Sequence, residues 1–301
     1  MTTIPGLHHV TAISGPAQEN VDFVTGVLGQ RLIKKTVNFD APETWHLYYG
    51  DPAGRPGSVL TFFPYPDAAP GRAGPGMAEA VAYAVPDIDA AMDRLALAAV
   101  DLDGLVERFG ARVMTLRAPD GLVVDLIESG SARDAHGFHS VTLSLRDPGP
   151  TARLMTGVMG YAETGHETFK GGERLRLTAP GGAAGAIVDL VRRDGAAPAR
   201  PGAGTIHHIA FRAPTGAAQL DWRERLAAAG FPTTPVIDRQ YFNAIYFREP
   251  GGVLFEIATD APGFAVDEDP GDLGKSLKLP PQYEAIRDRI ERALPVLTVP
   301  A

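Results

Sequence analysis

Short apolar segments alternate along the chain with polar turns and amphipathic stretches, and the same order recurs four times. In each unit, a short strand rich in β-branched and aromatic residues leads into a helix-like stretch. A turn rich in proline and glycine then precedes a closing apolar strand. The pattern predicts an α+β protein of four βαβββ modules. Because each module exposes one apolar sheet face, we expect the modules to pair and bury it.

We expect the modules and the C-terminal segment to span residues 5–66, 77–130, 136–194, 204–260 and 261–301. Two linkers rich in proline, alanine and glycine, 64–76 and 195–204, interrupt the pattern. Apolar residues at helical spacing predict a helix over 20–28 in the first module. A second amphipathic pattern predicts a C-terminal helix over 282–294.

The composition of the 301 residues narrows the classes of function. The net charge of −8 argues against nucleic acid as a partner. The chain has no cysteine, which excludes disulfides, zinc–thiolate sites, iron–sulfur clusters and cysteine nucleophiles and fits a cytoplasmic protein. Since no apolar run approaches the ~20 residues that span a bilayer, we expect no membrane partner.

Two of the predicted first strands contain consecutive histidines. When the four modules are aligned, one position in the first strands reads His9, Ala80, Ser140 and His208. One position in the closing strands reads Phe62, Asp125, Asp189 and Glu256. The simplest complete metal site is therefore His9, His208 and Glu256, a set of two histidines and one carboxylate typical of non-heme iron oxygenases. It requires the two ends of the chain to share one cavity.

Structural roles are the alternative for each of these side chains. A single strand histidine is more often hydrogen-bonded in the interior than bound to a metal, and Glu256 could pair with Arg248. We expect Asp125 and Asp189 to form salt bridges, since their modules lack a histidine at the matching position. The other histidines, which have no matching spacing, are His46, His136, His139 and His166.

Seven segments also share a pattern with one known family, and these are 7–11, 46–49, 55–57, 206–208, Tyr246, 250–256 and 279–283. They resemble the hydroquinone-type ring-cleaving dioxygenases of the vicinal oxygen chelate (glyoxalase/extradiol dioxygenase) superfamily, over nearly the whole chain. The resemblance implies two cup-shaped mixed sheets with a C-terminal helix, and a metal-bearing pair formed by the first and fourth modules. It implies Fe(II) at His9, His208 and Glu256, with Mn(II) or Zn(II) as alternatives in the isolated protein.

The same resemblance implies an active-site role for Tyr246 and contacts to the ligands or the substrate from Thr11, His8 and His207. Tyr246 and His207 are the candidates for acid–base catalysis. The family's substrate-contacting arginine has no clear counterpart, because the loop before Tyr246 is shorter by about two residues, and Arg239 is the candidate substitute. Sheet alternation would turn His8 and His207 away from the metal unless bulges interrupt the strands.

The function implied is that of an extradiol-type ring-cleaving dioxygenase, with O2 and a small hydroquinone- or catechol-type aromatic as its partners. Separately, the exposed sheet edges and the acidic C-terminal loop lead us to expect a homo-oligomer. A glyoxalase-like metal-dependent isomerase and a non-enzymatic protein that sequesters aromatic compounds are the alternatives. Phe62, Tyr241 and Phe247 either line an apolar pocket or pack in the core.

Overall fold

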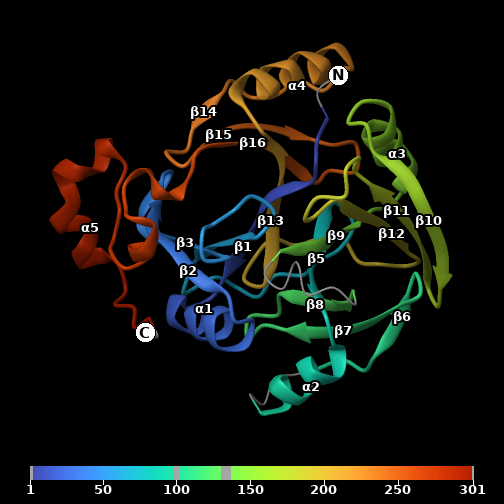
Figure 1. Cartoon of the computed structure of the whole chain (residues 1–301), viewed down its shortest axis with the longest axis horizontal. Coiled ribbons are helices and arrows are strands. Elements are labelled where there is room, and N and C mark those ends of the chain that lie inside the picture. The colour runs from blue at the N-terminus through green and yellow to red at the C-terminus, as the bar shows by residue number, and fades with distance from the viewer. Residues whose placement is uncertain (1–2, 98–99, 101, 130–136, 300–301) are drawn as a thin grey trace.

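Strands form the centre of the molecule and helices lie at its periphery in this computed structural model, which describes residues 3–97, 100, 102–129 and 137–299 (Figure 1). The strands make two mixed sheets of eight strands each. The first sheet has the order β14-β15-β16-β13-β1-β4-β3-β2 and the second the order β10-β11-β12-β9-β5-β8-β7-β6. The predicted α+β fold of paired modules in two cup-shaped mixed sheets is confirmed.

The first sheet joins strands from the two ends of the chain. Its members are β1 (Leu7–Ser14), β2 (Arg31–Asn38), β3 (Ala41–Gly50), β4 (Val59–Pro64), β13 (Thr205–Ala213), β14 (Ile237–Asp238), β15 (Phe242–Arg248) and β16 (Leu254–Pro262). The strands β1 and β13 are antiparallel neighbours at its centre. Each also pairs in parallel with the closing strand of its own unit, β4 or β16.

The second sheet repeats this arrangement with the middle of the chain. Its members are β5 (Met77–Val85), β6 (Val106–Arg108), β7 (Ala111–Arg117), β8 (Val123–Glu128), β9 (Phe138–Ser144), β10 (Ala162–Phe169), β11 (Gly172–Thr178) and β12 (Ile187–Arg193). Here β5 and β9 are the antiparallel central pair. The expected boundary between the second and third modules, at residues 130 and 136, lies outside the described residues, as does the end of the C-terminal segment at 301.

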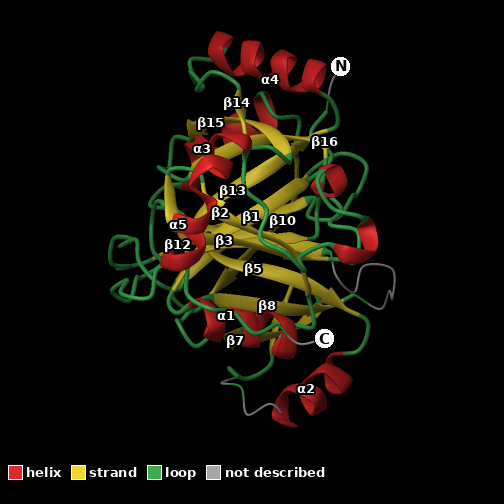
Figure 2. Ribbon diagram, turned by 90° about the vertical axis from the view of Figure 1, so that its left-hand side faces the viewer, coloured by secondary structure: helices red, strands yellow, loops and turns green. Residues whose placement is uncertain are grey.

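The helices of the four units are α1 (Ala17–Val21), α2 (Ile88–Leu97), α3 (Pro148–Gly157) and α4 (Gly216–Ala228). A second view, turned by 90° from that of Figure 1, shows these helices on the outside of the strands (Figure 2). The helix predicted over 20–28 begins earlier, at Ala17, directly after the N-cap residue Pro16. It then continues as a π-helical turn, Asp22–Val27. In the described part of the chain, no helix is long and apolar enough to cross a membrane.

The C-terminal segment folds back against the first sheet. The helix predicted over 282–294 consists of a 3-10 turn, Pro281–Ile286, followed by α5 (Arg287–Ala293). Short 3-10 turns, Phe264–Val266 and Pro270–Asp272, precede it. Pro280 and Pro281 stand at the N-cap and the first position of the 3-10 turn, where the missing backbone N–H leaves no hydrogen bond unmade.

The two linkers cross side by side between the sheets. The backbone groups of Arg72 and Arg200 exchange two hydrogen bonds of 2.8 Å, and Gly71 N–H donates to the Ala203 carbonyl at 2.8 Å. The largest apolar cluster of the described residues extends from the first sheet to the second and includes residues of all four units. The linkers therefore join two halves that pack as one body around this core.

Candidate metal centre and surrounding cavity

Three adjacent strands bring the predicted ligands together. His9 lies on β1, His208 on β13 and Glu256 on β16, which are neighbours in the first sheet. The Nε2 atoms of His208 and His9 lie 3.0 and 3.4 Å from Glu256 Oε2. All three side chains are buried, and their candidate ligand atoms lie within 4.8 Å of one another. The chain ends thus meet at one point, as the sequence pattern requires.

The Glu256 carboxylate is the electrostatic centre of this cluster. Neither of its oxygens makes a hydrogen bond, although the side chain is fully buried. Burial alone would raise the pKa of this carboxyl, but the His9 and His208 imidazoles outweigh burial and hold the pKa below its usual range. The alternative partner Arg248 instead donates to the Gly252 carbonyl at 2.8 Å.

These residues fit a divalent metal ion. A buried, ionised carboxylate without a hydrogen-bond donor is costly unless a cation compensates it. The Nε2 atoms of both imidazoles lie within 3.4 Å of the same carboxylate oxygen. Two histidines and one carboxylate suit Fe(II), and they also accept Mn(II) or Zn(II).

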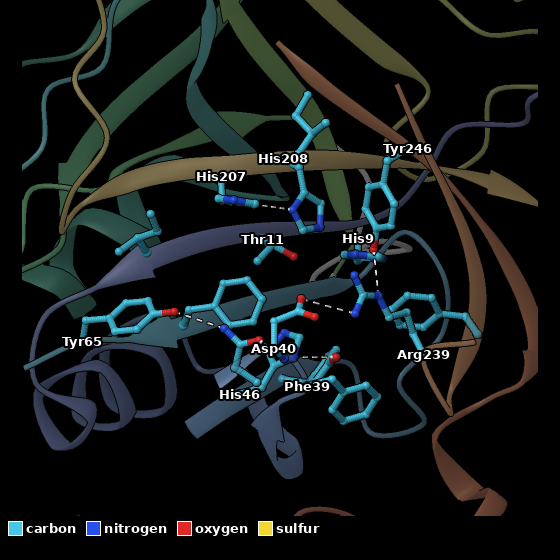
Figure 3. A pocket seen from close by; sticks show the side chains of 16 residues that line it. His9, Thr11, Phe39, Asp40, His46, Tyr65, His207, His208, Arg239 and Tyr246 are labelled. Carbon is cyan, nitrogen blue, oxygen red and sulfur yellow. Dashed lines mark hydrogen bonds and ion pairs between the residues drawn. The ribbon is translucent and has the colours of Figure 1, made fainter. Parts of the chain in front are cut away.

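Each proposed histidine ligand contacts the histidine that precedes it. Nδ1 of His9 lies 2.9 Å from Nδ1 of His8, and Nδ1 of His208 lies 2.8 Å from Nδ1 of His207. The second of these contacts is drawn in Figure 3. If the neighbouring ring accepts a hydrogen bond from Nδ1–H, the Nε2 atom of each ligand is left free for a metal.

Two β-bulges make these contacts geometrically accessible. In the ladder between β1 and β13, the register skips His8 and again skips His207. The extra residue lets consecutive side chains depart from strict alternation. The sequence pattern required such bulges if His8 and His207 were to lie near the proposed ligands, and both bulges are present.

His8 and His207 differ in their surroundings. His8 is buried behind His9, bonds to the Thr259 backbone and does not line the cavity. The contact of His8 with substrate stays a prediction, and the position of His8 suits a contact with the ligand His9 instead. Burial and the adjacent His9 lower the pKa of His8 to about 3, so the ring is neutral and can accept a hydrogen bond. His207 lines the cavity and is exposed.

A cavity of about 350 Å³ opens beside the three clustered groups. Tyr246 and Arg239 form one wall (Figure 3). Arg239 Nε donates to the Tyr246 hydroxyl at 3.3 Å, and its guanidinium lies 5.5 Å from the centre of the Tyr246 ring. Its Nη1 lies 3.6 Å from the exposed carboxylate of Asp40. Burial raises the pKa of Tyr246, so its hydroxyl stays protonated.

The loop that carries Arg239 is attached to the C-terminal segment. Asp267 Oδ2 accepts hydrogen bonds from Gln240 Nε2 at 2.9 Å and from the Tyr241 hydroxyl at 3.1 Å. Asp267 Oδ1 lies 2.6 Å from Nζ of the fully buried Lys34. Gln240 has a left-handed backbone, with φ of 66°. Asp267 therefore connects β2 with both residues that follow Arg239.

His46 is a cavity residue that the spacing argument did not identify. It lies on β3, where its Nε2 contacts Thr61 Oγ1 at 2.7 Å and its Nδ1 contacts the Tyr48 hydroxyl at 2.9 Å. Thr61 Oγ1 in turn lies 3.2 Å from Oγ1 of Thr11, which lines the cavity. Burial lowers the pKa of His46 well below its usual value. Alternation along β3, with His46 and Tyr48 on one face, is the signal that could have identified it.

The aromatic residues that form the apolar walls of this cavity differ from the candidates that the sequence suggested. Phe39, Phe63 and Phe242 line the cavity. The aromatic residues that the sequence offered as candidates for the cavity wall pack in the core instead. They are Phe62, Tyr241 and Phe247.

The strand register also corrects the internal alignment. Glu256, Asp189 and Asp125 each face the residue two positions after the aligned first-strand position, namely Ala210, Thr142 and Ala82. In the first unit the residue that faces Thr11 is Thr61. Thr61 rather than Phe62 therefore occupies the position of Glu256. Neither is a carboxylate, so the first unit still offers one ligand.

The remaining predictions concern residues away from this cavity. Asp125 binds Arg108, and Asp189 binds Arg176, as expected for salt-bridged carboxylates. His139 Nδ1 contacts Ser140 Oγ at 3.0 Å in the second sheet. His166 lies near Glu173 on the surface, and His136 lies outside the described residues.

The chain belongs to the Glyoxalase/Bleomycin resistance protein/Dioxygenase superfamily, whose sequence profile matches residues 6–126 and 137–257. It is 43% identical to "Putative ring-cleaving dioxygenase MhqO" of Bacillus subtilis, over 96% of this chain and 95% of that protein. It is 33% identical to chlorohydroquinone/hydroquinone 1,2-dioxygenase of Sphingobium indicum, over 97% and 96%. A crystal structure described as that of a "putative dioxygenase" from Bacillus subtilis superposes with a TM-score of 0.92 at 40% identity, over 100% of this chain and 99% of that one.

Proposed function

We propose that this protein is a metal-dependent dioxygenase that cleaves the ring of a hydroquinone- or catechol-type aromatic and incorporates both atoms of O2. The supporting observation is the convergence of His9, His208 and Glu256 beside a cavity with aromatic walls. The relatives named as ring-cleaving dioxygenases match nearly the whole chain, which supports the same chemistry here. We further propose the extradiol type, in which the bond between a hydroxylated carbon and its unhydroxylated neighbour breaks.

The metal would be held by His9 Nε2, His208 Nε2 and the Glu256 carboxylate. Fe(II) is the proposed ion, and when bound it would supply the redox coupling between O2 and the electron-rich ring. The cavity of about 350 Å³ suits a single aromatic ring, since small-molecule sites start near 300 Å³. Phe39, Phe63 and Phe242 would hold the apolar faces of that ring.

The polar residues of the cavity would orient the substrate and hold its proton. The Arg239 guanidinium offers a charge-assisted hydrogen bond to a phenolate oxygen. Tyr246, protonated and bonded to Arg239, can donate to an oxygen that becomes anionic during the reaction. His207 borders the cavity and can take up the phenolic proton. Thr11 offers a hydroxyl whose position is set by Thr61 and His46.

Anaerobic reconstitution with Fe(II), followed by an oxygen-electrode assay on hydroquinones and catechols, tests this proposal. We expect O2 uptake equal to the substrate consumed, and dependent on the added metal. An isomerase would convert its substrate without O2 uptake, and a sequestration protein would bind the aromatic without any metal requirement. Either result would overturn the proposal.

A further inference from the structure

The second sheet encloses a cavity of its own, of about 380 Å³. Residues of β5, β8, β9 and β11 line it, as residues of β1, β13 and β15 line the first cavity. Its walls are rich in charged side chains, whereas aromatic side chains dominate the walls of the first cavity. Its function is therefore a separate question from that of the metal centre.

This cavity occupies the place in the second sheet that the metal centre occupies in the first. The ladder between β5 and β9 skips Glu79 and His139, as the ladder between β1 and β13 skips His8 and His207. The same pair of bulges thus shapes both central strand pairs. The residue after each bulge is the position that carries a proposed metal ligand in the first sheet.

The metal-binding side chains are missing at these positions. Ala80 and Ser140 stand where the first sheet has His9 and His208. Asp189 stands where the first sheet has Glu256, but Arg176 already binds it through two hydrogen bonds of 2.8 and 2.9 Å. A cation would therefore find no free ligand here.

The balance of charge in this cavity is instead positive. Four arginines and three acidic residues line it. Each acidic residue has an arginine of its own, and the pairs are Asp125 with Arg108, Glu79 with Arg193, and Asp103 with Arg117. Arg174 is the fourth arginine, and its acidic neighbours are Asp189 and Glu167, which lie 3.4 and 3.5 Å away and outside the lining.

Arg174 is only 4% exposed, and its hydrogen bonds are incomplete. Its Nη1 makes long hydrogen bonds to Thr142 Oγ1 at 3.3 Å and to Asp189 Oδ2 at 3.4 Å. Its Nε makes none, and the closest oxygen of Glu167 lies 3.5 Å away. Burial, together with the nearby Arg108, lowers the pKa of Arg174 from its usual value. A buried guanidinium in this state is stabilised by an added anion.

We propose that the second cavity is a binding site for a small organic monocarboxylate, held by Arg174. A carboxylate matches the planar fork of a guanidinium, and a single negative charge balances the excess of one arginine over the acidic residues of the lining. The Thr142 hydroxyl lies beside the same guanidinium and can donate to the ligand. Ala73, Ala80 and Val123 provide apolar wall for the rest of an organic acid. This inference does not depend on the proposed dioxygenase reaction.

Thermal unfolding of the metal-loaded protein, titrated with butyrate, tests the proposal. Two compounds serve as controls. Butyramide has nearly the same shape as butyrate but no charge, and inorganic phosphate is an anion that is tetrahedral rather than planar. We expect butyrate to raise Tm in a saturable manner, butyramide to leave it unchanged, and phosphate to act at least tenfold more weakly than butyrate. No saturable effect of butyrate, or an equal effect of phosphate, would overturn the assignment.

Variants of one arginine in each cavity locate the site. Arg174→Met should weaken the apparent affinity for butyrate at least tenfold while metal content stays unchanged, and Arg239→Met in the first cavity should bind butyrate normally. Should Arg174→Met not fold, Arg174→Lys keeps the charge but loses the fork, and we expect at least a threefold loss. If butyrate binding depends on Arg239 and not on Arg174, the ligand occupies the first cavity and the proposal is wrong.

Discussion

The two sheets have the same architecture and enclose cavities of similar size, about 350 and 380 Å³, yet their chemistry is opposite. Both central strand pairs carry bulges at matching positions. In the first sheet the residues after the bulges are His9 and His208, and in the second they are Ala80 and Ser140. The scaffold therefore supplies converging positions, and a few side chains decide the chemical character of each cavity.

The carboxylates of the two sheets show the same contrast. Glu256 is buried between imidazoles and makes no hydrogen bond. Asp189 is equally buried but bound by Arg176, and Asp125 is bound by Arg108. A carboxylate that a guanidinium already neutralises has little to gain from a metal, whereas Glu256 has no other strong cation.

The largest effect should follow from removing a metal ligand in the first sheet. We expect Glu256→Gln to lose both bound metal and activity. The fall in metal affinity should exceed the 10- to 100-fold that is typical when a residue hydrogen-bonded to a metal ligand is removed. Its matched control is Asp189→Asn at the same position of the second sheet, which should keep stoichiometric metal. Metal analysis and the oxygen electrode measure both. Full metal content in Glu256→Gln would show that the cluster is not the metal site.

A smaller effect is expected from the histidines at the bulges. His8→Ala and His207→Ala remove the rings that contact Nδ1 of the ligands, so the affinity for metal should fall about 10- to 100-fold. His139→Ala changes the equivalent bulge of the second sheet and is the control. Competition with a chelator measures the affinities. Equal losses in all three variants would mean that only general stability had changed.

The connection between Asp267 and the loop of Arg239 should affect substrate more than metal. Asp267→Ala removes the acceptor for Gln240 and Tyr241, and we expect kcat/KM to fall about tenfold, equal to about 1.4 kcal/mol, mainly through KM. Metal content should not change. Asp272→Ala, which removes an exposed partner of Lys275, is the control. An unchanged KM in Asp267→Ala would contradict this positioning role.

The smallest effect concerns stability and pH in the second sheet. Burial, opposed in part by Asp189 and Asp125 and reinforced by Arg176, lowers the pKa of His139 to about 4. Because the unfolded chain takes up a proton near pH 6.5 and the folded one does not, His139 reduces stability as pH falls from about 6.5 to 4.

His139→Gln should therefore lessen the acid-induced loss of stability by roughly 1–2 kcal/mol between pH 7 and 4.5. Urea unfolding at a series of pH values measures this difference. His166→Gln, a change of a surface histidine in the same sheet, serves as the control. An identical pH dependence in His139→Gln and the unchanged protein would exclude the effect.

The candidate ligands were predictable because repeats and residue chemistry both pointed to them. His9 and His208 occupy matching strands, and strand periodicity allows only a limited choice of register. The one-residue error at Phe62 has a physical cause. The closing strand of the first unit, β4, is apolar and buried on both faces. Its sequence therefore shows no alternation of polar and apolar residues that would tell which side chains face the cavity. Only the pairing of Thr61 with Thr11 reveals the correct position.

The cavity walls were less predictable. Phe62 and Phe63 are neighbours with similar side chains, yet one packs in the core and the other faces the cavity. His46 reaches the cavity because β3 pairs with β4 and places its ring beside Thr61. Arg174 gives no local signal at all, since its contact with Asp189 is long only because Arg176 binds that carboxylate more closely.

By itself, the sequence determined the four-unit fold, the absence of cysteine chemistry and the three side chains capable of binding a metal, because these depend on composition and on local periodicity. The tertiary structure alone decided which residues share a cavity and which charges remain uncompensated. Both depend on contacts between strands that are distant in the sequence, and a shift of one residue in such a contact turns a side chain from a cavity into the core.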